Sequence, residues 1–123
     1  MAPRDLKERT RLFALAVRNF CRRLPRTDEA REVAAQLRCA ANSVRSNYRA
    51  ARKGRSRAEF QAKLGTVAEE AEECLDWLEY LRDANILTDA DLLDEAGQLT
   101  RIFAAAVKAT RANTNRMKIL SKS

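Results

Sequence analysis

Glycine and proline are scarce in this sequence, with 3 Gly and 2 Pro among 123 residues. These two residue types supply most of the turns and helix breaks in globular proteins. The commonest residues, Ala, Leu, Arg and Glu, are all good helix formers. A chain with so few turn-forming residues is expected to fold into a few long helices. No segment alternates apolar and polar side chains as a strand would.

Apolar side chains recur at steps of three and four residues in four segments. This spacing predicts four amphipathic helices, over residues 5–24, 28–53, 57–85 and 89–120. Capping and breaking residues mark the expected boundaries. These are Asp5 with Glu8, Pro25, Thr27, Gly54, Ser56 with Glu59, and Thr88.

Helices joined by connections of only a few residues pack antiparallel. The sequence therefore predicts an all-α fold, an antiparallel up-down-up-down four-helix bundle. The length suits one domain with its own core, over residues 1–123. The side chains that we expect to face inward include Phe20, Leu37, Tyr48, Phe60, Leu78, Leu99, Phe103 and Met117.

The side chains that most enzymes and metal sites need are missing or scattered. The chain has no His, the commonest general base near neutral pH, and no familiar nucleotide-binding or hydrolase motif. Cys21, Cys39 and Cys74 are far apart and form no CxxC pair, which argues against zinc. We expect a protein that is not an enzyme and that holds no metal or cofactor.

The sequence gives no sign of membrane association. No apolar run reaches the roughly 18 residues that span a bilayer, and the N-terminus lacks the apolar segment of a secretory signal. Three unpaired thiols suit a reducing compartment. We therefore expect a cytoplasmic protein with no membrane partner.

Charge is unevenly distributed along a chain whose net charge is +7. Residues 33–58 carry seven basic and no acidic side chains, and residues 96–123 carry six basic and none acidic. Arginine pairs bidentately with phosphate, and each neutralised phosphate releases counterions. The sequence predicts salt-dependent binding of RNA or DNA with little sequence preference. The candidate contacts are Arg38, Arg45, Arg49, Arg52, Lys53, Arg55, Arg57, Arg11, Arg18 and Arg22.

A second interpretation of the same charges is a structural or protein-interaction module that binds no nucleic acid. Residues 59–95 carry twelve acidic and two basic side chains. Arg49 and Arg52 could pair with acids of the third helix, within the chain or across subunits. The acidic face expected on that helix consists of Glu69, Glu72, Glu73, Asp76, Glu79 and Asp83.

Several side chains outside the core stripes predict a homo-oligomer. The candidate interface residues are Leu12, Leu15, Ser43, Asn47, Trp77 and Tyr80. Ser43 and Asn47 would form hydrogen bonds at a helix contact, as buried polar groups must. One flank of the second helix holds only small side chains, those of Ala35, Cys39, Ser43, Ser46 and Ala50. Such a flank allows a helix to approach closely, either inside the bundle or between subunits.

Short motifs give the sequence a family resemblance. They are QLR at 36–38, Ser43 with Asn47, GRSRAEF at 54–60, Glu69 with Glu73, DLKERT at 5–10 and LP at 24–25. Together they resemble the four-helix-bundle family named for the intervening sequences of 23S ribosomal RNA. The resemblance covers about residues 5–87, and the last helix fits by pattern alone.

The resemblance implies an antiparallel four-helix bundle, usually assembled as a homopentamer with a central opening. Members are encoded in insertions within 23S ribosomal RNA genes or stand alone in bacterial genomes. A related branch is the accessory protein of diversity-generating retroelements. That protein binds nucleic acid and associates with a reverse transcriptase, so the resemblance adds a reverse transcriptase to the candidate partners.

Overall fold

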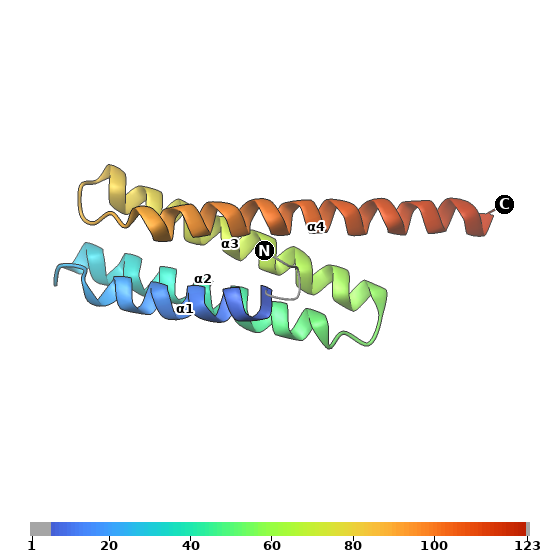
Figure 1. Cartoon of the computed structure of the whole chain (residues 1–123), viewed down its shortest axis with the longest axis horizontal. Coiled ribbons are helices and arrows are strands. Elements are labelled where there is room, and N and C mark those ends of the chain that lie inside the picture. Colours follow the sequence, from blue (N-terminus) through green and yellow to red (C-terminus); the bar gives the residue numbers. More distant parts are fainter. Residues whose placement is uncertain (1–5, 123) are drawn as a thin grey trace.

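The computed structural model describes residues 6–122, and this part of the chain forms four helices joined by short turns (Figure 1). They are α1 (Leu6–Arg22), α2 (Asp28–Arg52), α3 (Arg57–Asp83) and α4 (Ala90–Lys122). The predicted fold class is confirmed, and the helix ends differ from the predicted ones by two residues or fewer. The predicted capping residue Asp5 lies outside the described residues.

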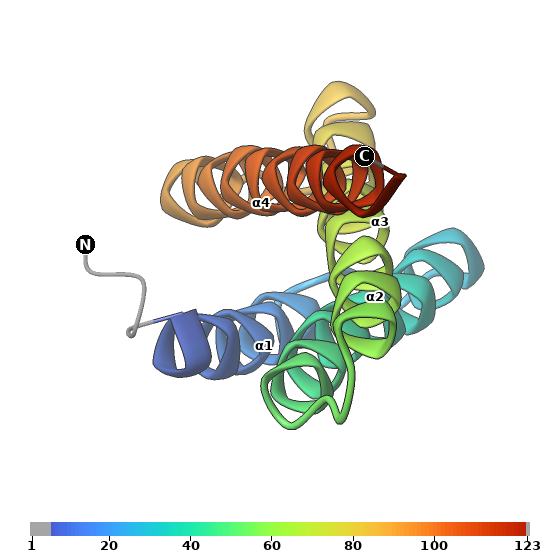
Figure 2. The same cartoon turned by 90° about the vertical axis from the view of Figure 1, so that its right-hand side faces the viewer.

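The helices pack mainly against their neighbours along the chain. Within the described residues, four pairs of helices are in close contact: α2 with α3 and α3 with α4 form the largest contacts, and α1 with α4 forms the smallest. Figures 1 and 2 show the reason: α3 runs diagonally, from beside α2 at its start to beside α4 at its end. The diagonal α3 therefore joins the hairpin of α1 and α2 to α4.

The core consists of large apolar side chains from all four helices. Phe20, Leu37, Leu78, Leu99 and Phe103 are 2 % exposed or less. Burying each such side chain stabilises the fold by about 1.5–3 kcal/mol. The sequence pattern predicted this set because these residues recur on one face of each helix.

Three aromatic or sulfur-containing side chains test the predicted core. Tyr48 faces inward as expected, its ring centroid 5.5 Å from that of Phe103. The placement of Phe60 and Met117 in the core is wrong, since they are 37 % and 51 % exposed. Phe60 lies in the first turn of α3, and Met117 lies near the C-terminal end of α4, where every side chain from 115 to 121 is exposed.

Two of the predicted N-caps are confirmed. The hydroxyl of Thr27 accepts from the Ala30 N–H at 3.1 Å, and that of Ser56 accepts from the Glu59 N–H at 3.1 Å. The return bond of the capping box is displaced by one residue. The Glu59 carboxylate accepts from the Arg55 N–H at 3.4 Å, in the turn before the cap.

The predicted N-cap of α4, Thr88, is wrong by one residue. The side chain of Asp89 caps this helix by accepting from the Leu92 N–H at 3.0 Å. A carboxylate at this position is also favoured by the helix dipole. Both residues can act as caps, so the sequence alone could not separate two candidates that stand side by side.

α3 ends in a left-handed turn at Asn85, whose φ is 58°. The Ile86 N–H donates to the Leu81 carbonyl at 2.9 Å, and the Asn85 N–H donates to the Arg82 carbonyl at 3.0 Å. These bonds form a Schellman motif, in which Asn is the commonest substitute for Gly. The motif ends α3 two residues before the predicted boundary.

A side chain at Gly54 would crowd neighbouring backbone atoms, and the backbone angles of Gly54 are not unusual. Its φ is not positive, although it follows α2 as a C-terminal glycine often does. A Cβ at this position would lie 3.1 Å from the Ala51 carbonyl oxygen and 3.3 Å from the Phe60 nitrogen. Glycine therefore lets the end of α2 approach the start of α3 closely.

A buried arginine links α1 to α4. Arg9 is 9 % exposed, and its guanidinium donates to both carboxylate oxygens of Glu95, at 3.0 and 2.5 Å, and to Gln98 Oε1 at 3.2 Å. The hydrogen bond to Glu95 raises the pKa of Arg9, and burial opposes it. The sequence analysis did not identify this pair, because its members are 86 residues apart and each looks like an ordinary surface charge.

We expect Arg9→Ala to lower the free energy of unfolding by about 1.5–3 kcal/mol, because hydrogen bonds to charged groups are worth this much and Gln98 would lose its donor. Urea unfolding followed by circular dichroism measures the change. Arg11→Ala is the matched control, since Arg11 on the same helix pairs with Glu8 at an exposed position. Equal effects of the two substitutions would contradict a structural role for the Arg9–Glu95 pair.

Candidate nucleic-acid interface

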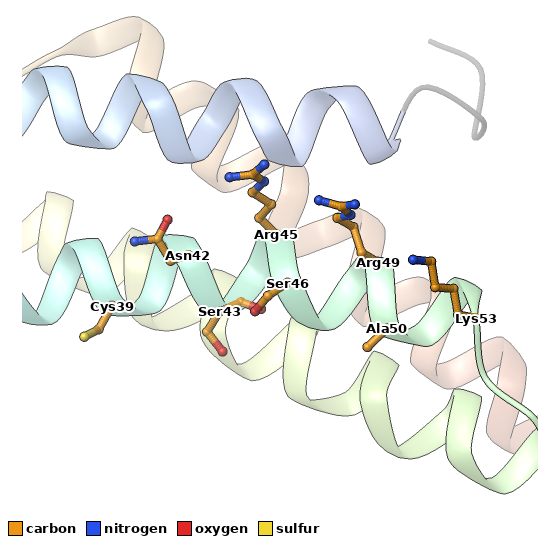
Figure 3. Close-up of a pocket in the computed structure, with 8 residues that line it drawn as sticks. All are labelled: Cys39, Asn42, Ser43, Arg45, Ser46, Arg49, Ala50 and Lys53. Atoms are coloured by element: carbon orange, nitrogen blue, oxygen red, sulfur yellow. The ribbon is translucent and has the colours of Figure 1, made fainter.

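Three basic side chains project from one face of the C-terminal half of α2. Arg45, Arg49 and Lys53 are spaced four residues apart, which places them on one side of a helix. All three point toward α1 (Figure 3). They line an open groove of about 780 Å³, together with small and uncharged side chains that leave the cations accessible.

Two further cations adjoin this group. Lys7 from the start of α1 and Arg52 from the end of α2 line a second groove together with Arg49 and Lys53. We call Lys7, Arg45, Arg49, Arg52 and Lys53 the basic groove. Lys7 was not among the predicted contacts. The antiparallel pairing of α1 and α2 was the available signal, because it brings the start of α1 beside the end of α2.

None of the ion pairs found between residues 6 and 121 includes a member of the basic groove. The alternative in which Arg49 and Arg52 pair with acids of α3 inside the chain is therefore wrong for the described residues. Gathered like charges raise the local positive potential, which attracts anions. Pairing across subunits is the part of that alternative that stays open.

The other predicted contacts do not join the basic groove. Arg38 and Arg22 line a separate groove, where the Arg38 side chain lies against Cys21. Arg11 is paired with Glu8, and Arg18 donates to Asn19 Oδ1 at 3.2 Å.

Arg57 lines a small groove with Phe60, Thr110 and Asn113, which puts it between α3 and α4. Arg55 lies in the turn between α2 and α3 and is exposed. The ten candidates are thus spread over several surfaces, and four of them meet.

The acidic face of α3 is accessible as predicted. Glu69, Glu72, Asp76 and Asp83 are exposed, while Glu73 and Glu79 are half-buried. Among the described ion pairs, this face contributes only Asp83, which contacts its neighbour Arg82 at 2.9 Å. The chain therefore presents a basic groove on α1 and α2 and an acidic face on α3.

Two of the candidate interface residues are exposed leucines. Leu12 and Leu15, both on α1, are 51 % and 40 % exposed. Trp77 is half-buried, and its ring meets that of Tyr80 edge to face with centroids 5.8 Å apart. An interface role for these residues stays a prediction.

Tyr80 also has a hydrogen-bond partner within the chain. Its hydroxyl donates to the carboxylate of Glu29, which joins α3 to the first turn of α2. This hydrogen bond raises the pKa of Tyr80.

Ser43 and Asn47 form hydrogen bonds with each other along α2. Asn47 Nδ2 donates to Ser43 Oγ at 2.8 Å and to the Ser43 carbonyl at 3.0 Å. The Ser43 hydroxyl also reaches Glu70 of α3. The pair therefore lies at the contact of α2 with α3, as expected of a polar pair at a helix contact. An additional role between subunits stays a prediction.

The small-residue flank of α2 is largely open to solvent. Ala35, Cys39 and Ser46 are exposed, so tight packing inside the bundle is wrong for these three. Ser43 and Ala50 are half-buried. Close approach of a second subunit is the explanation of this flank that stays open.

The described part of the chain shows neither a membrane-spanning segment nor a metal cluster. No helix within it combines the length and apolar character needed to cross a bilayer. Among the same residues, no three Cys, Asp or Glu side chains are grouped as metal ligands would be.

Burial raises the pKa of the Cys74 thiol well above its ordinary value, so this thiol stays protonated.

Fold and surface together define a small antiparallel four-helix bundle with a basic groove. The chain belongs to the 23S rRNA-intervening sequence protein family, whose pattern it matches over residues 5–105. It is similar to a crystal structure of a protein with unknown function from the S23 ribosomal protein family of Bacteroides thetaiotaomicron. The similarity has a TM-score of 0.76 at 24 % identity, and covers 84 % of this chain and 98 % of that one. No curated protein matches the chain.

Glu70 of α3 lies at the polar contact that includes Ser43. Partial burial raises its pKa, the nearby carboxylates of Glu73 and Glu69 raise it further, and the hydrogen bond from Ser43 opposes the shift. A raised pKa means that the folded state binds the proton more tightly than the unfolded state. At a pH above the pKa of Glu70 in the folded state, the ionised carboxylate therefore lowers the stability of the fold. This loss disappears as the pH falls toward the pKa of Glu70 in the unfolded state.

We expect Glu70→Gln to raise the melting temperature at pH 7, because the amide keeps a partner for Ser43 and removes the charge. The gain should vanish below about pH 4, where the unfolded carboxyl is also protonated. Melting curves from pH 3 to 8 measure this dependence. Glu72→Gln at an exposed position of the same helix is the control. A gain from Glu70→Gln that is constant with pH would contradict this account.

Proposed function

We propose that this protein is a non-enzymatic, homo-oligomeric four-helix bundle that binds the phosphates of RNA or DNA through the basic groove. The observation that carries the proposal is the convergence of five cations from α1 and α2 on one open surface. None of these cations has a partner among the described ion pairs. An anionic polymer would supply those partners and release its counterions.

The composition of the groove favours contacts to the backbone over contacts to bases. Arg and Lys bind phosphate irrespective of sequence. Stacking on bases requires aromatic side chains. Tyr48, the aromatic residue closest to these cations in sequence, packs its ring against Phe103 in the core. We therefore infer binding with little sequence preference.

Self-association is the second part of the proposal, with the pentamer that the family resemblance implies as the expected assembly. The exposed Leu12 and Leu15 support it, because large apolar side chains gathered outside the core are typical of contact surfaces. The separation of charge also supports it. The acidic face of α3 and the basic surfaces of α1 and α2 could meet between subunits in a ring.

The alternative function is a protein-interaction module, for example an accessory to a reverse transcriptase. The accessible acidic face of α3 favours it, since this face has few described intrachain partners and would repel nucleic acid. In that case the basic groove would contact a protein or a neighbouring subunit. Loss of assembly on removal of the groove charges would identify this case.

We expect the triple variant Arg45→Gln, Arg49→Gln, Lys53→Gln to weaken nucleic-acid binding strongly. Affinity falls with salt, so the slope of log affinity against log salt is negative. Each lost phosphate contact makes this slope less steep, by about 0.7 for single strands and about 0.9 for duplex DNA. Three lost contacts would make it less steep by about two to three. Filter binding of labelled RNA and DNA across a series of salt concentrations measures this slope.

Arg18→Gln, Arg55→Gln, Arg57→Gln is the matched control, because it removes the same charge from residues outside the groove. Light scattering on all three proteins monitors assembly, for which we expect a mass several times 13.9 kDa. If the wild-type oligomer shows no salt-dependent affinity for any nucleic acid, the proposed function is wrong. A stable monomer would contradict the proposed assembly.

A further inference from the structure

The C-terminal part of α4 extends beyond the part of the chain that matches the family. The family match ends at residue 105, whereas α4 continues to Lys122. Figure 1 shows this end running past the turn between α2 and α3. Nothing that describes the shared bundle therefore accounts for this segment.

Contacts with the bundle diminish along this segment. Val107 is the last buried side chain of α4, at 9 % exposed. Thr114 is half-buried, and its hydroxyl donates to Gln61 Oε1 of α3 at 3.1 Å. Every side chain from 115 to 121 is exposed. The projecting turns of α4 are thus a helix with open sides.

The exposed surface of this helix is basic along one side. Residues 96–123 contain no acidic side chain. Arg101, Lys108, Arg111 and Lys118 are all exposed, and at about 100° per residue they fall within an arc of about 100°. At about 1.5 Å per residue they extend over about 26 Å of the helix. We call these four residues the α4 stripe.

Few acidic side chains of the same chain lie close enough to neutralise the positive charges of the α4 stripe. None of its members occurs in the described ion pairs. Arg111 lines a shallow groove that also includes Glu69 of α3, which is the one acid along that lining. Lys108 and Lys118 line none of the described grooves that contain acids. A basic stripe in this state fits an anionic partner.

The apolar residues of the projecting end do not form a membrane-binding face. Met117, Ile119 and Leu120 are 51–69 % exposed. At about 100° per residue they spread over about 160°, and Arg116 falls between Ile119 and Leu120. An interfacial helix needs one continuous apolar face to enter a bilayer surface. The basic side chains therefore form a continuous stripe along α4, whereas the apolar side chains at its end do not form a continuous face.

We propose that the α4 stripe binds the backbone of double-stranded DNA as a second contact surface, separate from the basic groove. This inference rests on the proposed nucleic-acid binding and names the kind of nucleic acid. An α-helix is about 10–12 Å across, and the major groove of B-DNA is about 12 Å wide. The major groove of duplex RNA is too deep and narrow for such contacts. Lys118 lies on the projecting turns, and Arg101, Lys108 and Arg111 are exposed along the part of α4 that still contacts the bundle, so the duplex would meet the stripe from one side of the helix.

The test is a comparison of two full-length variants that change the net charge equally. Lys108→Gln, Arg111→Gln, Lys118→Gln neutralises three members of the α4 stripe. Ala109→Glu, Asn113→Glu, Met117→Glu adds three negative charges at exposed positions of the same helix, none of which is three or four residues from a member of the α4 stripe. Fluorescence anisotropy with labelled DNA and RNA duplexes of equal length, over a series of salt concentrations, measures affinity and salt dependence.

We expect the salt dependence of duplex DNA binding to be less steep in the stripe variant. The magnitude of the slope of log affinity against log salt should fall by about two to three, at about 0.9 per phosphate contact. The control should lower it by less than one, and duplex RNA should be affected less than duplex DNA. Equal slopes for the stripe variant and the wild type would overturn the inference. So would equal losses in the stripe variant and the control.

Other outcomes separate this inference from the proposed function. If wild type binds DNA and only the groove variant is weakened, the inference about α4 fails while the proposed function stands. If wild type binds no nucleic acid, the proposed function fails first. A lower mass of the stripe variant by light scattering would overturn the inference in favour of a contact between copies. If the stripe variant lost binding to anionic phospholipid vesicles and kept the wild-type affinity for duplex DNA, the inference would be overturned in favour of a lipid surface.

Discussion

Burial of one narrow apolar stripe from each of four helices holds this chain in its fold. Phe20, Leu37, Leu78, Leu99 and Phe103 are nearly inaccessible, and they come from all four helices. Most of the stability of helices in a protein comes from packing of this kind and not from helix propensity alone. Everything on the outside, the charged faces included, depends on this core for its position.

The arrangement of the charges follows from the same packing. α1 and α2 pair antiparallel, so the start of one meets the end of the other, and Lys7 comes beside Arg49, Arg52 and Lys53. α3 presents acids on the side opposite its core residues. The contact of α1 with α4 is the smallest of the four close helix contacts, and the hydrogen bonds of Arg9 with Glu95 join these two helices.

Much of the fold could be predicted from the sequence, because helix formation depends on residues three and four apart. The same local rules found the caps Thr27 and Ser56. They failed at Thr88 and Asp89, which are adjacent and can both act as caps. They also failed at Phe60 and Met117, whose spacing suits a core but whose places at helix ends leave them exposed.

The candidate site was harder to predict, because it depends on which helices lie beside one another. Sequence spacing grouped Arg38 with Arg45, Arg49 and Arg52, yet Arg38 lies in a different groove with Arg22. Lys7 and the pair of Arg9 with Glu95 require contacts over long sequence separations. The basic character of the end of α4 was visible in the sequence, but its projection beyond the bundle was not.

Protection of lysines from acetylation by bound nucleic acid tests the central claim most directly. Lys7 and Lys53 line the basic groove, whereas Lys63 on α3 is not part of its lining. Mass spectrometry of the protein, acetylated with and without saturating RNA or DNA, gives the modification of each lysine. The account predicts protection of Lys7 and Lys53 at low salt, loss of that protection at high salt, and little change at Lys63. Unchanged acetylation of Lys7 and Lys53 in the presence of bound nucleic acid would contradict it.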